Sequence, residues 1–238
     1  MPDGAANAYL ARPNDDSHPG VLFLKDAYGL RPAIEELVDR IAADGYVVLA
    51  PNVFYRAGRS PVPPMPDHND PDQRAGFFKS LRPLFEQLTP ERLAADGGGY
   101  LDYLAQAGAT EPVAITGYCM GARLGWRIAA AHPRRVAALA GFHAGGMATD
   151  AADSPHRSAG ELDAELYFGF ADQDPSMSVE QIATLEQALD AAGASYRSEV
   201  YPGAQHGYTM TDTPAHNAEA RERHFSELRG LLERALAN

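Results

Sequence analysis

The 238-residue sequence has a single cysteine, Cys119. A lone cysteine cannot close a disulfide within the chain, which excludes the disulfide-stapled scaffolds of small secreted proteins. Basic residues are also scarce: 20 lysines and arginines stand against 32 aspartates and glutamates, for a formal net charge of −12. Nucleic acids and anionic lipids attract basic surfaces, so we expect neither as a partner.

Long apolar runs are absent too. No stretch approaches the roughly 18 consecutive apolar residues of a membrane span, and residues 1–6 lack the basic and apolar regions of a signal peptide. We therefore expect a cytoplasmic protein without a membrane partner, as a monomer or a small homo-oligomer. No Gly-rich phosphate or dinucleotide loop follows the first apolar run, and the polar residues 68–72 are interpreted as a solvated turn. No cofactor and no metal are expected.

The sequence does contain a regular alternation of short apolar runs and helical patterns, which indicates βα units and a mostly parallel sheet. The run at 46–51 is almost continuously apolar, which favours a central sheet covered by helices on both faces. The length suits one α/β domain over residues 1–238. We expect strands at 20–24, 46–51, 113–117, 136–141, 166–170 and 196–201, and helices at 32–44, 77–88, 90–107, 121–131, 179–192 and 217–237.

Residues 53–72 break this alternation. The segment is rich in proline and poor in periodic apolar residues. It is predicted to be a surface excursion, either a wall or lid of a binding pocket or a solvated loop.

The central motif is Gly117-Tyr118-Cys119-Met120-Gly121, between a predicted strand and a predicted helix. In a turn this sharp the nucleophile takes strained backbone angles, and small residues two positions away on each side avoid a clash. The positive end of the following helix favours a thiolate at Cys119. The backbone N–H of Met120 is well placed as an oxyanion donor.

The partners that a nucleophile needs follow in chain order. In α/β-hydrolase folds that order is nucleophile, acid, histidine. An acidic turn with Asp172 and Asp174 follows the strand at 166–170, and His206 follows the last strand. All of them lie at the carboxyl ends of strands, where open α/β sheets bind ligands. His143 also follows a strand and is interpreted as structural.

The chain resembles the dienelactone hydrolase family over nearly its whole length. Segments 20–52, 115–131, 166–178 and 200–208 carry the resemblance, and the cysteine in the elbow is its most specific feature. The resemblance implies an α/β-hydrolase fold and a catalytic triad of Cys119, His206 and Asp174, with Asp172 as the alternative acid. It also implies that the N–H groups of Ala27 and Met120 form the oxyanion hole.

Two positions depart from the family pattern. Asp26 stands where the family has a glutamate that interacts with the resting cysteine, and its side chain is one methylene shorter. Met210 stands where narrow dienelactone hydrolases have an arginine for the substrate carboxylate. The dienelactone itself is therefore not predicted as the substrate. We expect Asp26, Tyr118 and Tyr208 to line the substrate pocket.

These features predict a hydrolase that cleaves a carboxylic ester or lactone through a thioacyl-enzyme intermediate. Its partner would be a small-molecule substrate. The alternative is a non-catalytic or redox-responsive binding protein on the same fold, because a fold alone does not fix an activity. Esterase activity that depends on Cys119 would separate the two.

Overall fold

The computed structural model describes residues 1–67 and 70–237, and its centre is one seven-stranded sheet of order β1-β3-β2-β4-β5-β6-β7. The six strands from β2 to β7 are parallel to their neighbours, whereas β1 pairs with β3 in the antiparallel direction. The strands are β1 (Ala8–Ala11), β2 (His18–Leu24), β3 (Val47–Pro51), β4 (Ala109–Tyr118), β5 (Val136–Phe142), β6 (Glu165–Ala171) and β7 (Tyr196–Tyr201).

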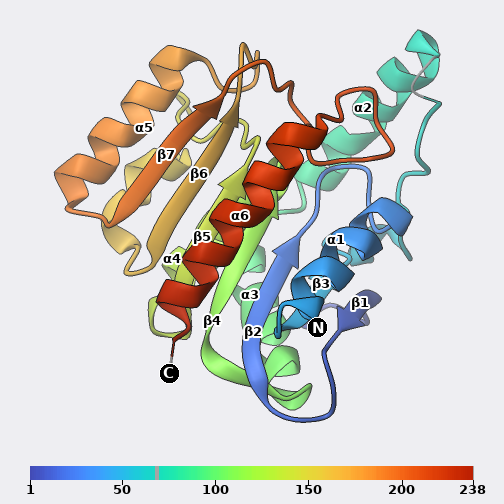
Figure 1. Ribbon diagram of the computed structural model, residues 1–238. Helices are drawn as coiled ribbons and strands as arrows, with labels where there is room; N and C mark the ends of the chain where they lie inside the picture. The colour runs from blue at the N-terminus through green and yellow to red at the C-terminus, as the bar shows by residue number, and fades with distance from the viewer. Residues whose placement is uncertain (68–69, 238) are drawn as a thin grey trace.

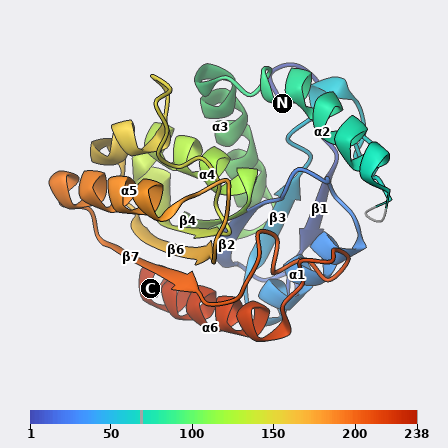
Figure 2. The same cartoon turned by 90° about the horizontal axis from the view of Figure 1, so that it is seen from above.

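Helices cover both faces of the sheet (Figures 1 and 2). Helices α1 and α6 lie on one face, and α3, α4 and α5 lie on the other (Figure 2). The helices are α1 (Pro32–Ala43), α2 (Pro71–Phe85), α3 (Pro90–Gln106), α4 (Met120–Ala131), α5 (Val179–Ala192) and α6 (Ala218–Ala235). Short 3-10 turns lie at Tyr55–Ala57, Pro133–Arg135 and Pro155–Glu161. The prediction of a mostly parallel sheet between two helical layers is confirmed.

Two apolar cores hold the layers together, one on each face of the sheet. Alternate residues of β2 divide between them: Leu22 and Leu24 pack toward the core that contains Trp126, and Val21 and Phe23 pack toward the core that contains Leu228. All four β2 side chains are fully buried. This two-sided burial accounts for the continuous apolar runs in the sequence.

The segment 53–72 is only partly the surface excursion that was predicted. Val53, Phe54 and Tyr55 are buried, with at most 7% of their surface exposed, because the chain packs into the core before it turns outward. Residues 68 and 69, which belong to this segment, lie outside the described residues. Helix α2 then begins at Pro71, earlier than predicted, and Figure 1 places it beside the carboxyl ends of the strands. Within the described residues, no helix has the length and apolar character needed to cross a membrane.

Candidate active site

Cys119 forms the whole connection between β4 and α4. The strand ends at Tyr118 and the helix begins at Met120. Cys119 has φ 55° and ψ −118°, a conformation that costs a non-glycine residue on the order of 1–3 kcal/mol. Its backbone N–H donates to the carbonyl of Phe142 on β5 at 3.1 Å, which anchors the turn. The side chain remains partly exposed, at the carboxyl edge of the sheet.

The two glycines of the motif are required by close backbone contacts. A Cβ atom on Gly117 would lie 2.4 Å from the carbonyl oxygen of Gly121, and one on Gly121 would lie 2.0 Å from that of Leu24. Both distances are far below van der Waals contact with backbone atoms that cannot move independently. The spacing of small residues around Cys119 therefore follows from the tightness of the turn.

His206 and Asp174 come from two neighbouring loops at the same edge of the sheet. Nδ1 of His206, in the loop after β7, lies 2.6 Å from Oδ2 of Asp174, in the loop after β6. The Asp174 side chain is 2% exposed and the His206 side chain 30%. Asp172 faces elsewhere, since its Oδ2 accepts the backbone N–H of Gly203 at 2.9 Å. Of the two candidate acids, Asp174 is the one in contact with the histidine.

The electrostatics of His206 favour its protonated form. Burial alone would lower its pKa, but hydrogen bonds to Asp174 and Cys119, and the charges of both, raise the pKa to about 10. Burial likewise raises the pKa of Asp174, and the hydrogen bonds from His206 and Ser176 outweigh this and lower it. Asp174 is therefore an anion at neutral pH, and its charge stabilises an imidazolium at His206.

Ser176 is a contact of this pair that the sequence did not reveal. Its hydroxyl donates to Oδ1 of Asp174 at 2.7 Å and lies 3.2 Å from Nδ1 of His206. Its backbone N–H donates to the same Oδ1 at 2.8 Å. Two donors from one residue thus hold one carboxylate oxygen, which leaves Oδ2 for the imidazole.

Two backbone N–H groups flank the thiol. Ala27 follows β2, lines the same cavity as Cys119, and its N–H has no acceptor among the described residues. Met120 is the first residue of α4, a position where the N–H has no acceptor within the helix. Both groups are thus free to bind an oxygen that carries negative charge.

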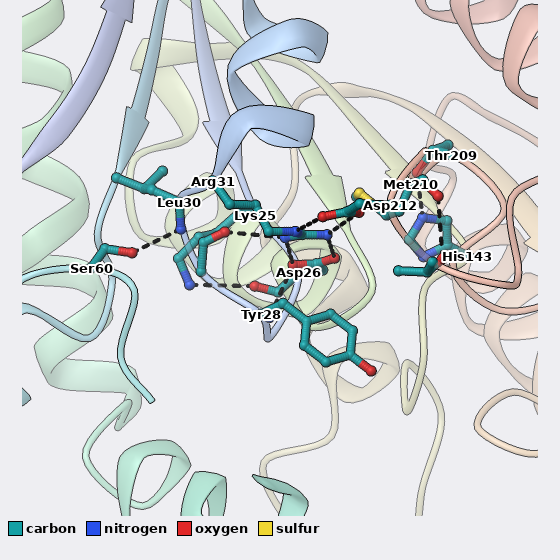
Figure 3. A network of polar contacts seen from close by, with 12 residues as sticks. Lys25, Asp26, Tyr28, Leu30, Arg31, Ser60, His143, Thr209, Met210 and Asp212 are labelled. Carbon is teal, nitrogen blue, oxygen red and sulfur yellow. Dashed lines mark hydrogen bonds and ion pairs between the residues drawn. The ribbon is translucent and has the colours of Figure 1, made fainter. Parts of the chain in front are cut away.

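Asp26 is held by a buried arginine (Figure 3). Nη1 and Nη2 of Arg31 donate to the two oxygens of Asp26 at 2.7 and 2.9 Å. Nε and Nη2 of Arg31 also donate to Asp212, at 2.6 and 3.2 Å, and Nη1 donates to the carbonyl of Gly29 at 3.1 Å. Arg31 thus makes a bidentate hydrogen bond to the Asp26 carboxylate and links it to Asp212.

These groups surround a cavity of about 400 Å³. It is lined by residues of the loops after β2 and β5, of α2, of the elbow, and of the loop before α6: Asp26, Ala27, Tyr28, Arg74, Phe78, Cys119, His143, Gln205, His206, Gly207, Met210, Thr213, Pro214 and Ala215. The predicted site residues Cys119, His206, Asp26 and Ala27 therefore meet at one cavity. Within the described chain, no group of three or more His, Cys, Asp or Glu side chains is arranged to hold a metal ion.

The structure places the predicted pocket residues Tyr118 and Tyr208 away from the cavity. Both are fully buried. The Tyr118 hydroxyl lies 2.8 Å from Nε2 of His224 on α6, and the Tyr208 hydroxyl donates to the carbonyl of Gly169 at 3.0 Å. Tyr118 points to the α6 side of the sheet because successive strand residues face opposite sides. Both tyrosines pack in the core beneath the site and do not line the cavity.

His143, interpreted as structural, lies in the wall of the cavity. Its ring is fully buried, packs edge-on against the ring of His206 with 5.2 Å between centroids, and places Nε2 2.8 Å from the hydroxyl of Thr209 (Figure 3). Burial lowers the pKa of His143 well below the usual histidine range, and the charges of His206 and His224 lower it further. His143 is therefore a neutral ring beside the candidate base.

Comparisons with known proteins identify the family of the chain. A model of the dienelactone hydrolase family matches residues 6–236. A relative from Salmonella typhi, provisionally named carboxymethylenebutenolidase, is 30% identical over 225 residues, which are 90% of this chain and 78% of the relative. A counterpart from Escherichia coli K12 with the same provisional name is 30% identical over 224 residues, 90% of this chain and 77% of its own.

A solved structure gives the same result. A protein from Klebsiella pneumoniae, provisionally described as a dienelactone hydrolase, has a TM-score of 0.82 and 25% identity, over 95% of this chain and 92% of its own. These matches confirm the resemblance that the elbow and its partners indicated. The chain belongs to the dienelactone hydrolase family and is a dienelactone hydrolase-like hydrolase.

Proposed function

We propose that this protein hydrolyses a carboxylic ester or lactone with Cys119 as nucleophile, His206 as base and Asp174 as the acid that orients the base. The observation that carries the proposal is the 2.6 Å contact between His206 and Asp174, together with the cavity that His206 lines with Cys119, the only thiol of the chain. Membership of the dienelactone hydrolase family supports ester or lactone hydrolysis as the reaction class.

In the first half-reaction, the proton of Cys119 already lies on His206, whose raised pKa favours the imidazolium, and the thiolate sulfur attacks the carbonyl carbon of the substrate. The N–H groups of Ala27 and Met120 donate to the developing oxyanion, at a value of about 3 kcal/mol per donor. The tetrahedral species collapses to a thioester on Cys119, and His206 gives its proton to the departing alkoxide.

In the second half-reaction, His206 takes a proton from water, which attacks the thioester carbonyl. The acid product leaves, and the Cys119 thiolate is restored beside the protonated His206. Asp174 stabilises the imidazolium in both steps and fixes the tautomer that presents Nε2 to the sulfur. Ser176 holds Asp174 in the orientation that this role needs.

The test uses para-nitrophenyl acetate with the wild type and with Cys119→Ala and His206→Ala. Wild-type turnover that both variants lose supports the proposal. Because the chain has one cysteine, iodoacetamide that inactivates the wild type should add one carbamidomethyl group per chain, and mass spectrometry after rapid acid quench should detect an acetyl group on Cys119. Turnover retained by Cys119→Ala would refute the nucleophile, and an inactive wild type would favour the binding-protein alternative.

A further inference from the structure

We propose that the cavity selects esters that carry no negative charge and discriminates against substrates with a carboxylate. This inference rests on the proposed ester hydrolysis at Cys119. It follows from the cationic groups around the cavity, each of which is already occupied, neutral or exposed to solvent.

Arg31 is the buried cation beside the cavity, and it has no donor left for a substrate. A guanidinium has five N–H groups. Nε and one N–H of Nη2 go to Asp212, one N–H each of Nη1 and Nη2 goes to Asp26, and the remaining N–H of Nη1 goes to Gly29. A substrate carboxylate could bind Arg31 only by displacing Asp26 or Asp212. It would also add a third negative charge around a single arginine.

The other basic groups offer no replacement. His143 is neutral, because burial lowers its pKa well below the usual range. Lys25 is fully buried beneath the site, with Nζ 3.3 Å from the carbonyl oxygen of Asp26 and 4.4 Å from the centroid of Phe54, and it does not line the cavity. His206 is engaged by Asp174 and Cys119.

Arg74 on α2 is the only lysine or arginine among the described residues that line the cavity. It is exposed to solvent. An ion pair formed at an exposed arginine contributes little, because water and salt screen it. Arg74 therefore does not offset the net charge of −1 on the group formed by Asp26, Asp212 and Arg31.

The remaining lining suits an uncharged, apolar group. Tyr28 and Phe78 form an aromatic wall with Phe77, whose ring is 4.9 Å from that of Tyr28 and 5.6 Å from that of Phe78. Phe78 is 53% exposed. Exposed apolar surface beside a cavity is typical of a binding site, where a ligand removes that surface from water. Met210 extends the apolar lining on the opposite loop.

The test compares two chemically matched esters, mono-para-nitrophenyl adipate and its methyl ester. They share the reacting carbonyl and the leaving group and differ by one negative charge at the far end. We expect kcat/KM for the methyl ester to exceed that for the acid by roughly tenfold or more, because like charges at a binding site are strongly disfavoured. The ratio should fall as salt is added, since salt screens the repulsion.

Asp212→Asn tests the assigned origin of the selectivity. This substitution removes one negative charge and keeps the shape of the side chain. The ratio of kcat/KM for the methyl ester to kcat/KM for the acid should therefore decrease. Asp163→Asn is the matched control, because Asp163 is exposed and precedes β6 at the opposite edge of the sheet, and it should leave the ratio unchanged. Arg74→Gln should also leave it unchanged.

The outcomes separate this inference from the proposed function. If the acid is hydrolysed as fast as the methyl ester or faster, in a reaction that Cys119→Ala abolishes, the selectivity is refuted and the ester hydrolysis stands. Loss of acid turnover in Arg74→Gln would then identify Arg74 as a carboxylate site. If neither ester is cleaved in a Cys119-dependent way, the proposed function fails, and the inference fails with it.

Discussion

Asp174 and His206 are joined by a 2.6 Å contact between Oδ2 and Nδ1, across 32 residues of sequence and between two loops of neighbouring strands. The carboxylate is nearly inaccessible, at 2% exposure, while 30% of the imidazole remains open toward the cavity. A buried anion behind a partly open imidazole stabilises positive charge on the ring without offering the carboxylate to a substrate. Asp172, two residues earlier, serves a turn instead.

The first prediction compares these two aspartates. Asp174→Asn should lower kcat/KM by about 10²- to 10⁴-fold, whereas Asp172→Asn should keep it within about threefold of the wild type, because that variant loses only one exposed hydrogen bond. Steady-state kinetics with para-nitrophenyl acetate measures both. Equal losses in the two variants would contradict the assignment of Asp174.

The same pair predicts the alkaline side of the pH profile. The pKa of His206 is raised to about 10 by Asp174 and Cys119, so His206 should lose the proton that it gives to the departing alkoxide, and kcat/KM should fall, as the pH rises through about 10. Asp174→Asn removes part of what raises this pKa, and its alkaline limb should therefore move to lower pH. Rates are measured from pH 5 to 11, after subtraction of the Cys119→Ala background. An alkaline limb at the same pH in both proteins would refute the coupling.

Ser176→Ala should alter the acidic side instead. The Ser176 hydroxyl donates to Asp174 and helps to lower the pKa of that carboxyl. Without it, Asp174 should protonate at higher pH, so the acidic limb of the kcat/KM profile should move upward, with a loss of kcat and little change in KM. Ser176→Thr keeps the hydroxyl and should restore the wild-type limb. If Ser176→Ala instead lost the same fraction of activity at every pH, this role of Ser176 in setting the pKa of Asp174 would be contradicted.

Much of the fold could be predicted because its determinants are local. Five of the six predicted strands are largely apolar, and turns punctuate them, so their positions and mostly parallel arrangement follow from the sequence. Strand β1 was missed because it has only four residues, Ala8–Ala11, and none of them is fully buried. The start of α2 was missed because its first turns carry few apolar residues. Its capping pattern was readable: the Asp70 side chain accepts the N–H of Gln73, whose amide donates back to Asp70.

The site could be predicted only in part, for a related reason. Cys119 lies in a sequence-local motif, and His206 and Asp174 follow in the order that the fold imposes. The pairing of Arg31 with Asp212 spans 181 residues, and no local pattern indicates it. Tyr118 was expected in the pocket because it adjoins Cys119, but strand alternation turns it to the opposite side of the sheet.

The elbow also predicts a large effect on folding. Gly121→Ala places a Cβ 2.0 Å from the carbonyl oxygen of Leu24, so the helix would have to shift from the sheet, at a cost of about 3 kcal/mol or more. The matched control is Gly76→Ala, also in a helix, where a Cβ meets nothing within 4 Å. That variant should gain about 0.5–1 kcal/mol. Thermal denaturation of both variants and the wild type measures the contrast, and equal melting temperatures would contradict it.

The last prediction concerns the buried lysine beneath the site. Burial lowers the pKa of Lys25 from its ordinary value of 10.5 to about 8. In that interval the unfolded chain binds more protons than the folded one, so this group makes the free energy of unfolding rise as the pH rises from about 8 to 10.5. Below pH 8 the buried ammonium costs on the order of 1–3 kcal/mol.

Lys25→Met removes that cost. The variant should be more stable than the wild type at pH 7, and most of the advantage should be lost by pH 10.5, where the wild-type lysine is neutral in the folded state and half protonated in the unfolded state. Chemical denaturation at pH 7, 9 and 10.5 gives the free energies of unfolding. Lys79→Met provides the control, because Lys79 is exposed on α2 and its replacement removes no buried charge. A Lys25→Met difference that does not vary with pH would show that packing, and not the buried charge, determines the effect of Lys25 on stability.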